Sequence, residues 1–367
     1  MKGKIVISKV RIIIVFLLLL AVTFAPRSLF LPSLPALNAF ESGITVSGLS
    51  SGGFMAGQFH VAFSNSVSGV GIFSAGPYLC SRGNFGTAVG KCTSSAKSID
   101  DRYIEELLKA SKKLEREEKI DRLENLQNDK VYIFHGDADP TVHVNAAYKT
   151  KQWYQLAKVA EERIMMKVLE NAGHAFPTKE FGNSCEADTE PPWISKCGFD
   201  GALEMMTFLY DELQPQQDTL QGELIEFNQT EFFGEDLNSM ADKAYAYVPK
   251  KCRQERCHIH VFFHGCQQGY SMVPQDRKND NPKFDNPPYS KIEKTVINNV
   301  GLNHIADANN IIVLYPQLKK STKPFNPRGC YDFWGYVRNG ELTYATKHGE
   351  QLRTVYRMVE RLSGGAH

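Results

Sequence analysis

The sequence predicts an α/β fold in which helices flank a mostly parallel central sheet within a single domain. Three observations predict it. The chain has 367 residues, 42% of them hydrophobic, which suffices for one large core. Short apolar runs rich in β-branched residues alternate with longer segments of helical spacing. A glycine-rich turn joins the first of these runs to a helical segment, as happens where a strand of a parallel sheet leads directly into a helix.

The first half of the chain predicts strands with helices between them. The strand-like runs are residues 43–47, 67–75, 130–136 and 163–169. Apolar residues at helical spacing predict helices over residues 101–126, 146–161 and 200–213. This alternation is typical of parallel βα units.

The turn at residues 48–53 reads Gly-Leu-Ser-Ser-Gly-Gly and has the Gly-x-Ser-x-Gly pattern of a nucleophile elbow. Small residues must flank the serine, because larger side chains would collide across such a sharp turn. Ser50 holds the third position of the pattern, where the turn exposes its Oγ, and is therefore preferred over Ser51 as the nucleophile. The alternative is an ordinary serine in a glycine-rich turn.

The strand pattern starts again after Pro215, with runs at residues 243–249, 258–263 and 310–316 and a last helix at residues 350–362. An ordinary α/β-hydrolase builds several strands before its elbow, but here almost nothing precedes the elbow except an N-terminal leader. Residues 216–367 would supply those strands if they preceded residue 43. The order predicts a circularly permuted α/β-hydrolase, in which residues 40–215 carry the elbow, the acid and the base.

A serine nucleophile needs a general base and an acid to orient that base, and both are expected in loops after later strands. His174 follows the run at residues 163–169 and is the candidate base. After the run at residues 130–136, Asp137 and Asp139 compete for the role of the acid. Asp137 is more simply explained as a turn residue that hydrogen-bonds its own backbone.

The N-terminus carries Lys2, Lys4, Lys9 and Arg11 before an apolar run at residues 12–22, which is typical of an export signal. We expect residues 1–39 to be signal peptide and leader, and the protein to be extracellular or periplasmic. An uncleaved membrane anchor is the alternative. Residues 1–39 hold five basic and no acidic residues, so their removal would change the formal net charge from +1 to −4. No basic surface for nucleic acid is indicated.

Eight cysteines follow the leader, and an even number in an exported chain indicates disulfides. Proximity in the sequence suggests the pairs 80–92, 185–197 and 252–257, which leaves Cys266 with Cys330. A zinc site is the alternative for Cys252 and Cys257, with the alternating histidines His258, His260 and His264, but no second pair of ligands at metal spacing accompanies them. We therefore expect no metal and no cofactor.

Five motifs together give the chain a family resemblance. They are residues 48–55, His-Gly-x-x-Asp at 135–139, Gly-His-x-Phe-Pro at 173–177, Phe-His-Gly-Cys at 263–266 and Cys-Tyr-Asp-Phe-Trp-Gly at 330–335. In this order they resemble the secreted poly(3-hydroxybutyrate) depolymerases whose lipase box lies near the N-terminus. The resemblance implies a Ser50–Asp139–His174 triad and an oxyanion hole formed by the backbone N–H groups of Ser51 and Cys266.

Tyr331, Phe333 and Trp334 are the candidate substrate contacts, in a patch of aromatic residues that also includes Tyr336. Tyr331 and Phe333 stand where such enzymes often show tryptophan. Core packing is the alternative for these aromatic residues. The expected function is that of a secreted, monomeric serine esterase that acts on polyester or oligoester without a protein partner. The alternatives are an esterase for soluble or carbohydrate esters, such as a feruloyl or acetyl-xylan esterase, and a binding module on an inactive hydrolase fold.

Overall fold

The computed structural model describes residues 31–365 except 187–189, 217–218, 235–237, 274–290 and 339. The predicted export signal therefore lies outside the described residues. Residues just before the predicted boundary at residue 39 are packed against the body, because Leu34 and Ala39 are buried and the amides of Leu37 and Ala39 donate to the carbonyl of Leu362 at 3.0 Å. The folded body begins well before residue 40.

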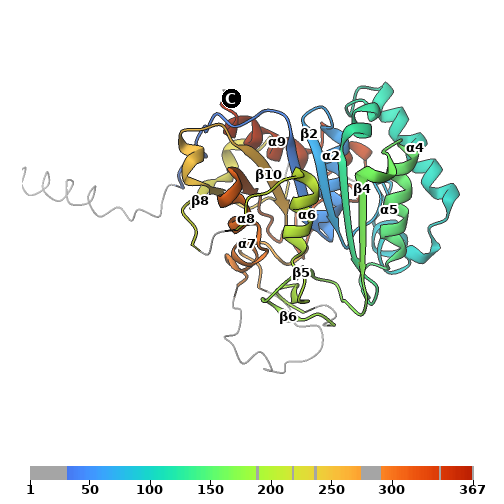
Figure 1. The fold of residues 1–367 in the computed structure, drawn as a ribbon. Helices are drawn as coiled ribbons and strands as arrows, with labels where there is room; N and C mark the ends of the chain where they lie inside the picture. The colour runs from blue at the N-terminus through green and yellow to red at the C-terminus, as the bar shows by residue number, and fades with distance from the viewer. Residues whose placement is uncertain are drawn as a thin grey trace, which may run out of the picture.

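An eight-stranded sheet crosses the molecule in the spatial order β4-β3-β2-β1-β10-β11-β9-β8 (Figure 1). Neighbours from β4 to β11 are parallel, and β9 and β8 are antiparallel at one edge. The strands are β1 (Ile44–Leu49), β2 (Val67–Phe73), β3 (Lys130–Gly136), β4 (Ile164–Leu169), β8 (Glu223–Asn228), β9 (Lys243–Val248), β10 (His258–Phe263) and β11 (Ile311–Tyr315). A small parallel sheet contains β5 (Phe176–Thr178), β6 (Asn183–Ser184) and β7 (Ile194–Lys196).

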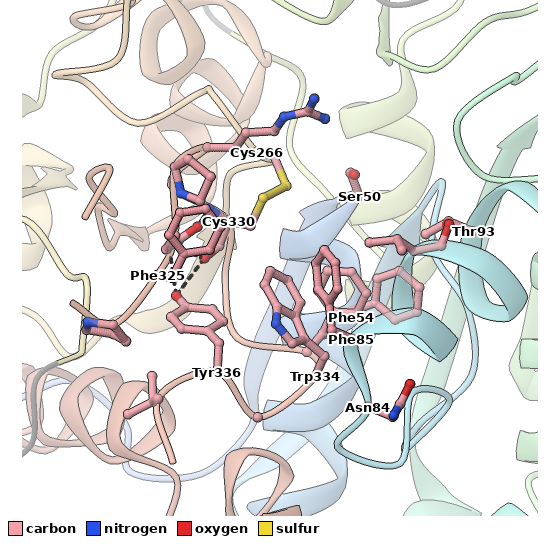
Figure 2. Close-up of a pocket in the computed structure, with 18 of the residues that line it drawn as sticks. Ser50, Phe54, Asn84, Phe85, Thr93, Cys266, Phe325, Cys330, Trp334 and Tyr336 are labelled. Atoms are coloured by element: carbon pink, nitrogen blue, oxygen red, sulfur yellow. Dashed lines mark hydrogen bonds between the residues drawn. A yellow bond between two sulfur atoms is a disulfide. The ribbon is translucent and has the colours of Figure 1, made fainter. Parts of the chain in front are cut away.

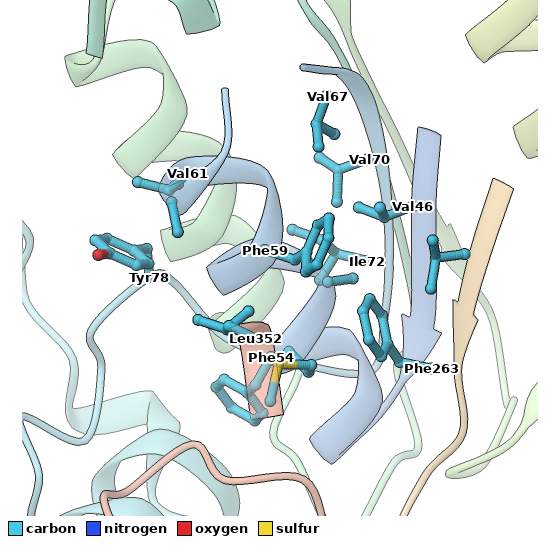
Figure 3. Packing of buried hydrophobic residues seen from close by; sticks show 14 of the residues in the cluster. Val46, Phe54, Phe59, Val61, Val67, Val70, Ile72, Tyr78, Phe263 and Leu352 are labelled. Carbon is cyan, nitrogen blue, oxygen red and sulfur yellow. The ribbon is translucent and has the colours of Figure 1, made fainter. Parts of the chain in front are cut away.

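Helices cover both faces of the large sheet (Figure 1). One face is covered by α2 (Ser51–Ala62), α4 (Asp101–Arg116), α5 (Asn145–Leu156) and α9 (Glu350–Leu362), and the other by α6 (Gly201–Tyr210), α7 (Thr295–Asn299) and α8 (Leu302–Asn309). On the first face, Phe59 of α2 packs against Val70 and Ile72 of the sheet (Figure 3). A short helix, α3 (Phe85–Val89), precedes α4 in the chain.

The strand order confirms the predicted permutation. β1 comes first in the chain but lies in the middle of the sheet, between β2 and β10. The strands that an ordinary hydrolase has before its elbow come from the C-terminal half, and the end of α9 at Leu362 lies beside the chain that enters β1. In the order of an ordinary hydrolase, the chain would begin at β8 and end after α6. In this chain α6 and β8 are consecutive elements.

Several elements differ from the sequence prediction, among them α3, α7, α8 and the small sheet, which no pattern predicted. The helix expected over residues 101–126 ends at Arg116, because Glu118 takes a left-handed φ of 55° and turns the chain. Leu123 and Leu126, which supplied the later part of the pattern, are buried from a separate 3₁₀ turn. The edge strand β8 is absent from the predicted strands, since its mixture of charged and apolar residues gives no continuous run.

Candidate active site

Ser50 lies in a sharp turn between β1 and α2, with φ 56° and ψ −121°. Non-glycine residues adopt a positive φ only rarely, and such strain concentrates at functional sites. Close packing explains the glycine at position 52, where a Cβ would lie 2.0 Å from the carbonyl oxygen of Phe263 and 2.5 Å from that of His264. The elbow is therefore pressed against the end of β10, as the Gly-x-Ser-x-Gly pattern predicts.

His174 and Asp139 form a buried pair after β4 and β3. Nδ1 of His174 lies 2.7 Å from Oδ2 of Asp139, and the Asp139 carboxylate is inaccessible to solvent. Since the carboxylate accepts, Nδ1 carries the hydrogen and Nε2 is the ring nitrogen that can accept one. The loops approach closely because residue 136 is glycine: a Cβ there would lie 2.2 Å from the carbonyl oxygen of Ala172.

The surroundings of Asp139 keep it ionised. Burial would raise the pKa of this carboxyl, but the facing His174 ring, His135 and the backbone amide of Val142 outweigh burial and hold the pKa below its usual value. The amides of Thr141 and Val142 donate to Oδ1 at 2.8 and 2.9 Å. The other candidate acid, Asp137, is exposed and accepts from the amide of Asn171 at 2.6 Å. It bridges the two loops and does not contact His174.

His135 supports the acid from behind. It is fully buried, its Nε2 lies 2.7 Å from the carbonyl oxygen of Val142, and the same nitrogen is 3.4 Å from Oδ2 of Asp139. Burial lowers the pKa of the imidazole, so His135 is neutral and donates from Nε2. The contact places His135, the first residue of the His-Gly-x-x-Asp motif, in the immediate surroundings of the Asp139 carboxylate.

Ser50 and His174 line one small pocket with Cys266. No hydrogen bond within the described residues occupies the backbone N–H groups of Ser51 and Cys266. Ser51 is the first residue of α2, where helix geometry leaves the N–H groups without intrahelical partners. These amides are therefore available to an oxyanion formed on a carbonyl bound at Ser50.

The loop that carries Cys266 is fixed on both sides by neutral side chains. His264 accepts from the amide of Leu318 at 3.0 Å through Nε2, and its Nδ1 lies 2.7 Å from the carbonyl oxygen of Gly265. Burial lowers the pKa of His264 to about 4, so the ring stays neutral in this orientation. Gln268 accepts from the amide of Gly265 at 2.6 Å and donates to the carbonyl of Pro192 at 2.7 Å.

All four predicted disulfides are present: Cys80–Cys92, Cys185–Cys197, Cys252–Cys257 and Cys266–Cys330. The last of these joins the oxyanion loop to the segment of aromatic residues at 331–336. His260, one of the alternating histidines, bonds Thr45 at 2.7 Å and Ser47 at 2.8 Å. Within the described part of the chain no three side chains are arranged as metal ligands.

A cleft of about 1380 Å³ opens from Ser50 and is lined by both halves of the chain, mostly by residues within 83–94 and 322–340 (Figure 2). Its aromatic lining residues are Phe54, Phe85, Phe325, Phe333, Trp334 and Tyr336. The ring of Phe333 stacks on that of Phe54 with centroids 4.4 Å apart, and Trp334 meets Phe333 edge to face. Phe325 and Phe85 are 71% and 58% exposed, so they form the rim of the cleft. Sequence reasoning missed Phe54, Phe85 and Phe325, because isolated aromatic residues carry no local signal of a shared surface.

Tyr331 is not where the sequence analysis expected it. It is completely buried, its hydroxyl donates to the carbonyl of Pro316 at 2.7 Å, and its ring packs against Phe263 and His264. Tyr331 does not line the cleft. It packs against the core side of the loop that carries His264 and Cys266. Core packing is the correct explanation for Tyr331, whereas Phe333 and Trp334 do face the cleft.

Asp332 shapes the segment that presents these aromatic residues. Its buried carboxylate accepts from the backbone N–H groups of Trp334, Gly335, Tyr336 and Val337 at 2.6 to 3.2 Å. Burial raises the pKa of Asp332 to about 6, against the lowering effect of these four donors. No sequence pattern predicts that Asp332 would accept these four hydrogen bonds, because an aspartate between aromatic residues occurs in loops of many conformations.

No helix in the described part of the chain combines the length and the apolar character needed to cross a bilayer.

No family model matches the chain, but known proteins are similar to it over most of its length. A poly(3-hydroxybutyrate) depolymerase of Delftia acidovorans is 35% identical over 339 residues, which cover 91% of this chain but 62% of that protein. A polyhydroxybutyrate depolymerase of Talaromyces funiculosus is 33% identical over 358 residues, 91% of this chain and 93% of the relative.

Two solved structures are also similar to the chain. The PHB depolymerase of Penicillium funiculosum has a TM-score of 0.74 at 30% identity, with 91% of this chain and 100% of that chain covered. A PHB depolymerase in which one serine is replaced by alanine, in complex with an R3HB trimer, has a TM-score of 0.75 at the same identity and coverage.

Proposed function

The chain belongs to the poly(3-hydroxybutyrate) depolymerase family, and from that premise we propose that it is a serine esterase that hydrolyses poly(3-hydroxybutyrate) or its oligomers. The observation that carries the proposal is the position of Ser50. It lies on a strained elbow, shares one pocket with His174 and opens into a long aromatic cleft on its other side. An extended apolar polyester chain fits a cleft of that kind.

The reaction follows from the roles of the side chains. Oγ of Ser50 attacks the ester carbonyl while Nε2 of His174 takes its proton, and Asp139 holds the ring in the required tautomer. The amides of Ser51 and Cys266 donate to the oxyanion. When the intermediate collapses, His174 gives the proton to the leaving alcohol, and the acyl group remains on Ser50. His174 then activates water, which hydrolyses the acyl-enzyme.

The proposal is tested by incubating the purified protein with poly(3-hydroxybutyrate), hydroxybutyrate oligomers, a feruloylated sugar and acetylated xylan. We expect acid release from the polymer or its oligomers and little from the sugar esters, with Ser50→Ala as the inactive control. Rapid hydrolysis of a sugar ester with the hydroxybutyrate substrates untouched would favour the alternative esterase.

We further propose that the protein is exported and acts as a monomer. Four disulfides support an oxidising compartment. Edman sequencing of the mature protein, recovered from outside the cytoplasm, would test this. Because residues 32–39 belong to the folded body, a mature N-terminus at or before residue 32 is expected, and retention of the protein in the cytoplasm would contradict export.

A further inference from the structure

Two pockets of very different size meet at Ser50. The large aromatic cleft measures about 1380 Å³ and the small pocket about 90 Å³. Both are lined by Ser50, Thr141, Cys266 and Arg328. An ester bond presented to Ser50 therefore has one side in the cleft and the other in the small pocket.

The position of His174 decides which side is which. His174 lines the small pocket and not the cleft. Under the proposed function, on which this inference rests, His174 must deliver a proton to the leaving oxygen, so the leaving alcohol lies on its side. The acyl part of the chain then occupies the aromatic cleft.

The small pocket has room for a short group only. A water molecule takes about 30 Å³ in the liquid. A pocket of about 90 Å³ therefore has the room of about three waters, which suits one short group such as a hydroxybutyrate unit and not a longer chain. Trp193 and Gln268 are among the other residues that line it.

The charges that line the pockets have one sign. Among the described lining residues of the cleft, Lys323 and Arg328 carry a positive charge, and Arg328 also lines the small pocket. No Asp or Glu is among the described residues that line either pocket. The backbone of Arg328 is held in place, because its carbonyl accepts from the amide of Gln267 at 2.7 Å and Cys330 is bonded to Cys266. A guanidinium has five donors, so it can take a carboxylate in addition to other contacts.

We propose that the small pocket is a subsite for the carboxyl-terminal unit of an oligoester, whose free carboxylate is bound by Arg328. Cleavage at Ser50 then breaks the ester bond of the last unit. The acyl chain passes to Oγ of Ser50, and the proton taken by His174 goes to the leaving oxygen. The enzyme releases one 3-hydroxy acid at a time from the carboxyl end, and water completes the cycle.

The test compares a hydroxybutyrate trimer with a free carboxylate and the same trimer as its methyl ester. For the wild-type protein we expect a lower KM for the free acid and the monomer as the first product. We define the free-acid preference as kcat/KM for the free acid divided by kcat/KM for the methyl ester. Arg328→Gln should reduce this ratio about ten- to a hundredfold, chiefly by raising KM for the free acid. Arg328→Lys should restore part of it, since it keeps the charge.

Lys323→Gln is the matched control, because it removes the other cation of the cleft and should leave the preference at its wild-type value. Inhibition by free 3-hydroxybutyrate provides a second readout and should weaken in Arg328→Gln. An equal loss on both trimers, or an equal effect of Lys323→Gln, would overturn the subsite. If the wild-type protein hydrolysed neither trimer, the proposed function itself would have failed.

Discussion

The two sides of the active site are built in different ways. On the triad side, Ser50, Asp139 and His174 each lie within a few residues of the end of a parallel strand, and the sheet brings them together. On the oxyanion and cleft side, Cys266 follows the parallel strand β10 by three residues, but Trp334 lies in a long loop after β11. A disulfide and a buried carboxylate hold these two segments. The triad side depends on the sheet, whereas the cleft side depends on a few crosslinks that can be removed singly.

The largest effect is expected on the triad side, at the nucleophile. Ser50→Ala should leave a folded protein whose ester hydrolysis falls by about five to six orders of magnitude, because the attacking atom is lost. Ser51→Ala is the matched control and should lose far less, since the backbone N–H remains and its Oγ accepts only a long bond, 3.3 Å, from the amide of Tyr331. Steady-state kinetics on a chromogenic short-chain ester would measure both. An inactive Ser51→Ala with an active Ser50→Ala would show that the register is wrong.

The next largest effect separates the two aspartates. Asp139→Asn should reduce kcat by about 10⁴, because the ring of His174 would lose its correct tautomer, and His174→Ala should be at least as damaging. Asp137→Asn should stay within a modest factor of wild type, since Asp137 accepts from a backbone amide and is exposed. The same kinetic assay decides between them. If Asp137 proved indispensable and Asp139 replaceable, the triad side would need a different acid.

On the cleft side, replacement of Cys266 and Cys330 by serine should lower both stability and rate. The bridge closes a loop of 64 residues, which corresponds to about 4 kcal/mol in the loop-entropy model. Loosening one oxyanion donor should cost roughly a hundredfold in kcat. Urea unfolding and kinetics would measure the two effects.

Replacement of both Cys252 and Cys257 is the control for that pair. This bridge spans 5 residues, so about 2 kcal/mol should be lost while kcat stays at the wild-type value. A similar loss of kcat in both double variants would mean that general destabilisation, and not a displaced oxyanion donor, slows the reaction.

The smallest effect concerns Asp332 and depends on pH. The folded-state pKa of about 6 lies above the value of about 3.9 for an unfolded chain. The protonated Asp332 carboxyl therefore adds to the free energy of unfolding. This contribution is fully present below the unfolded pKa and is lost as the pH rises through about 6. Relative to Asp332→Asn, which does not titrate, the wild-type protein should lose up to about 3 kcal/mol of stability between about pH 4 and pH 7. Urea unfolding across this range tests it, and a constant or growing advantage of the wild type would contradict it.

The same contrast explains what the sequence could predict. Ser50 and His174 could be proposed because short motifs place them after strands, and the permuted order followed from the missing strands before the elbow. Asp139 was separated from Asp137 only by family resemblance, since spacing alone allows either carboxylate. The structure supplies the physical difference, which is the 2.7 Å contact with His174.

The cleft could not be predicted to the same depth. Its lining depends on Phe54, Phe85 and Phe325, which are distant in sequence and meet only in the fold. Tyr331 belongs to the same aromatic motif as Trp334 but points into the core. Which side chains of an irregular loop face inward depends on its tertiary hydrogen bonds, here those of Asp332, and no periodicity reports them.

The central claim is that Ser50 is acylated during turnover with His174 as its base. Reaction with an organophosphate ester, followed by peptide mapping in a mass spectrometer, tests it most directly. We predict one label per molecule, on Oγ of Ser50, that is absent from Ser50→Ala and forms far more slowly in His174→Ala. A label on Ser51 or another residue, or a label retained in Ser50→Ala, would contradict the claim.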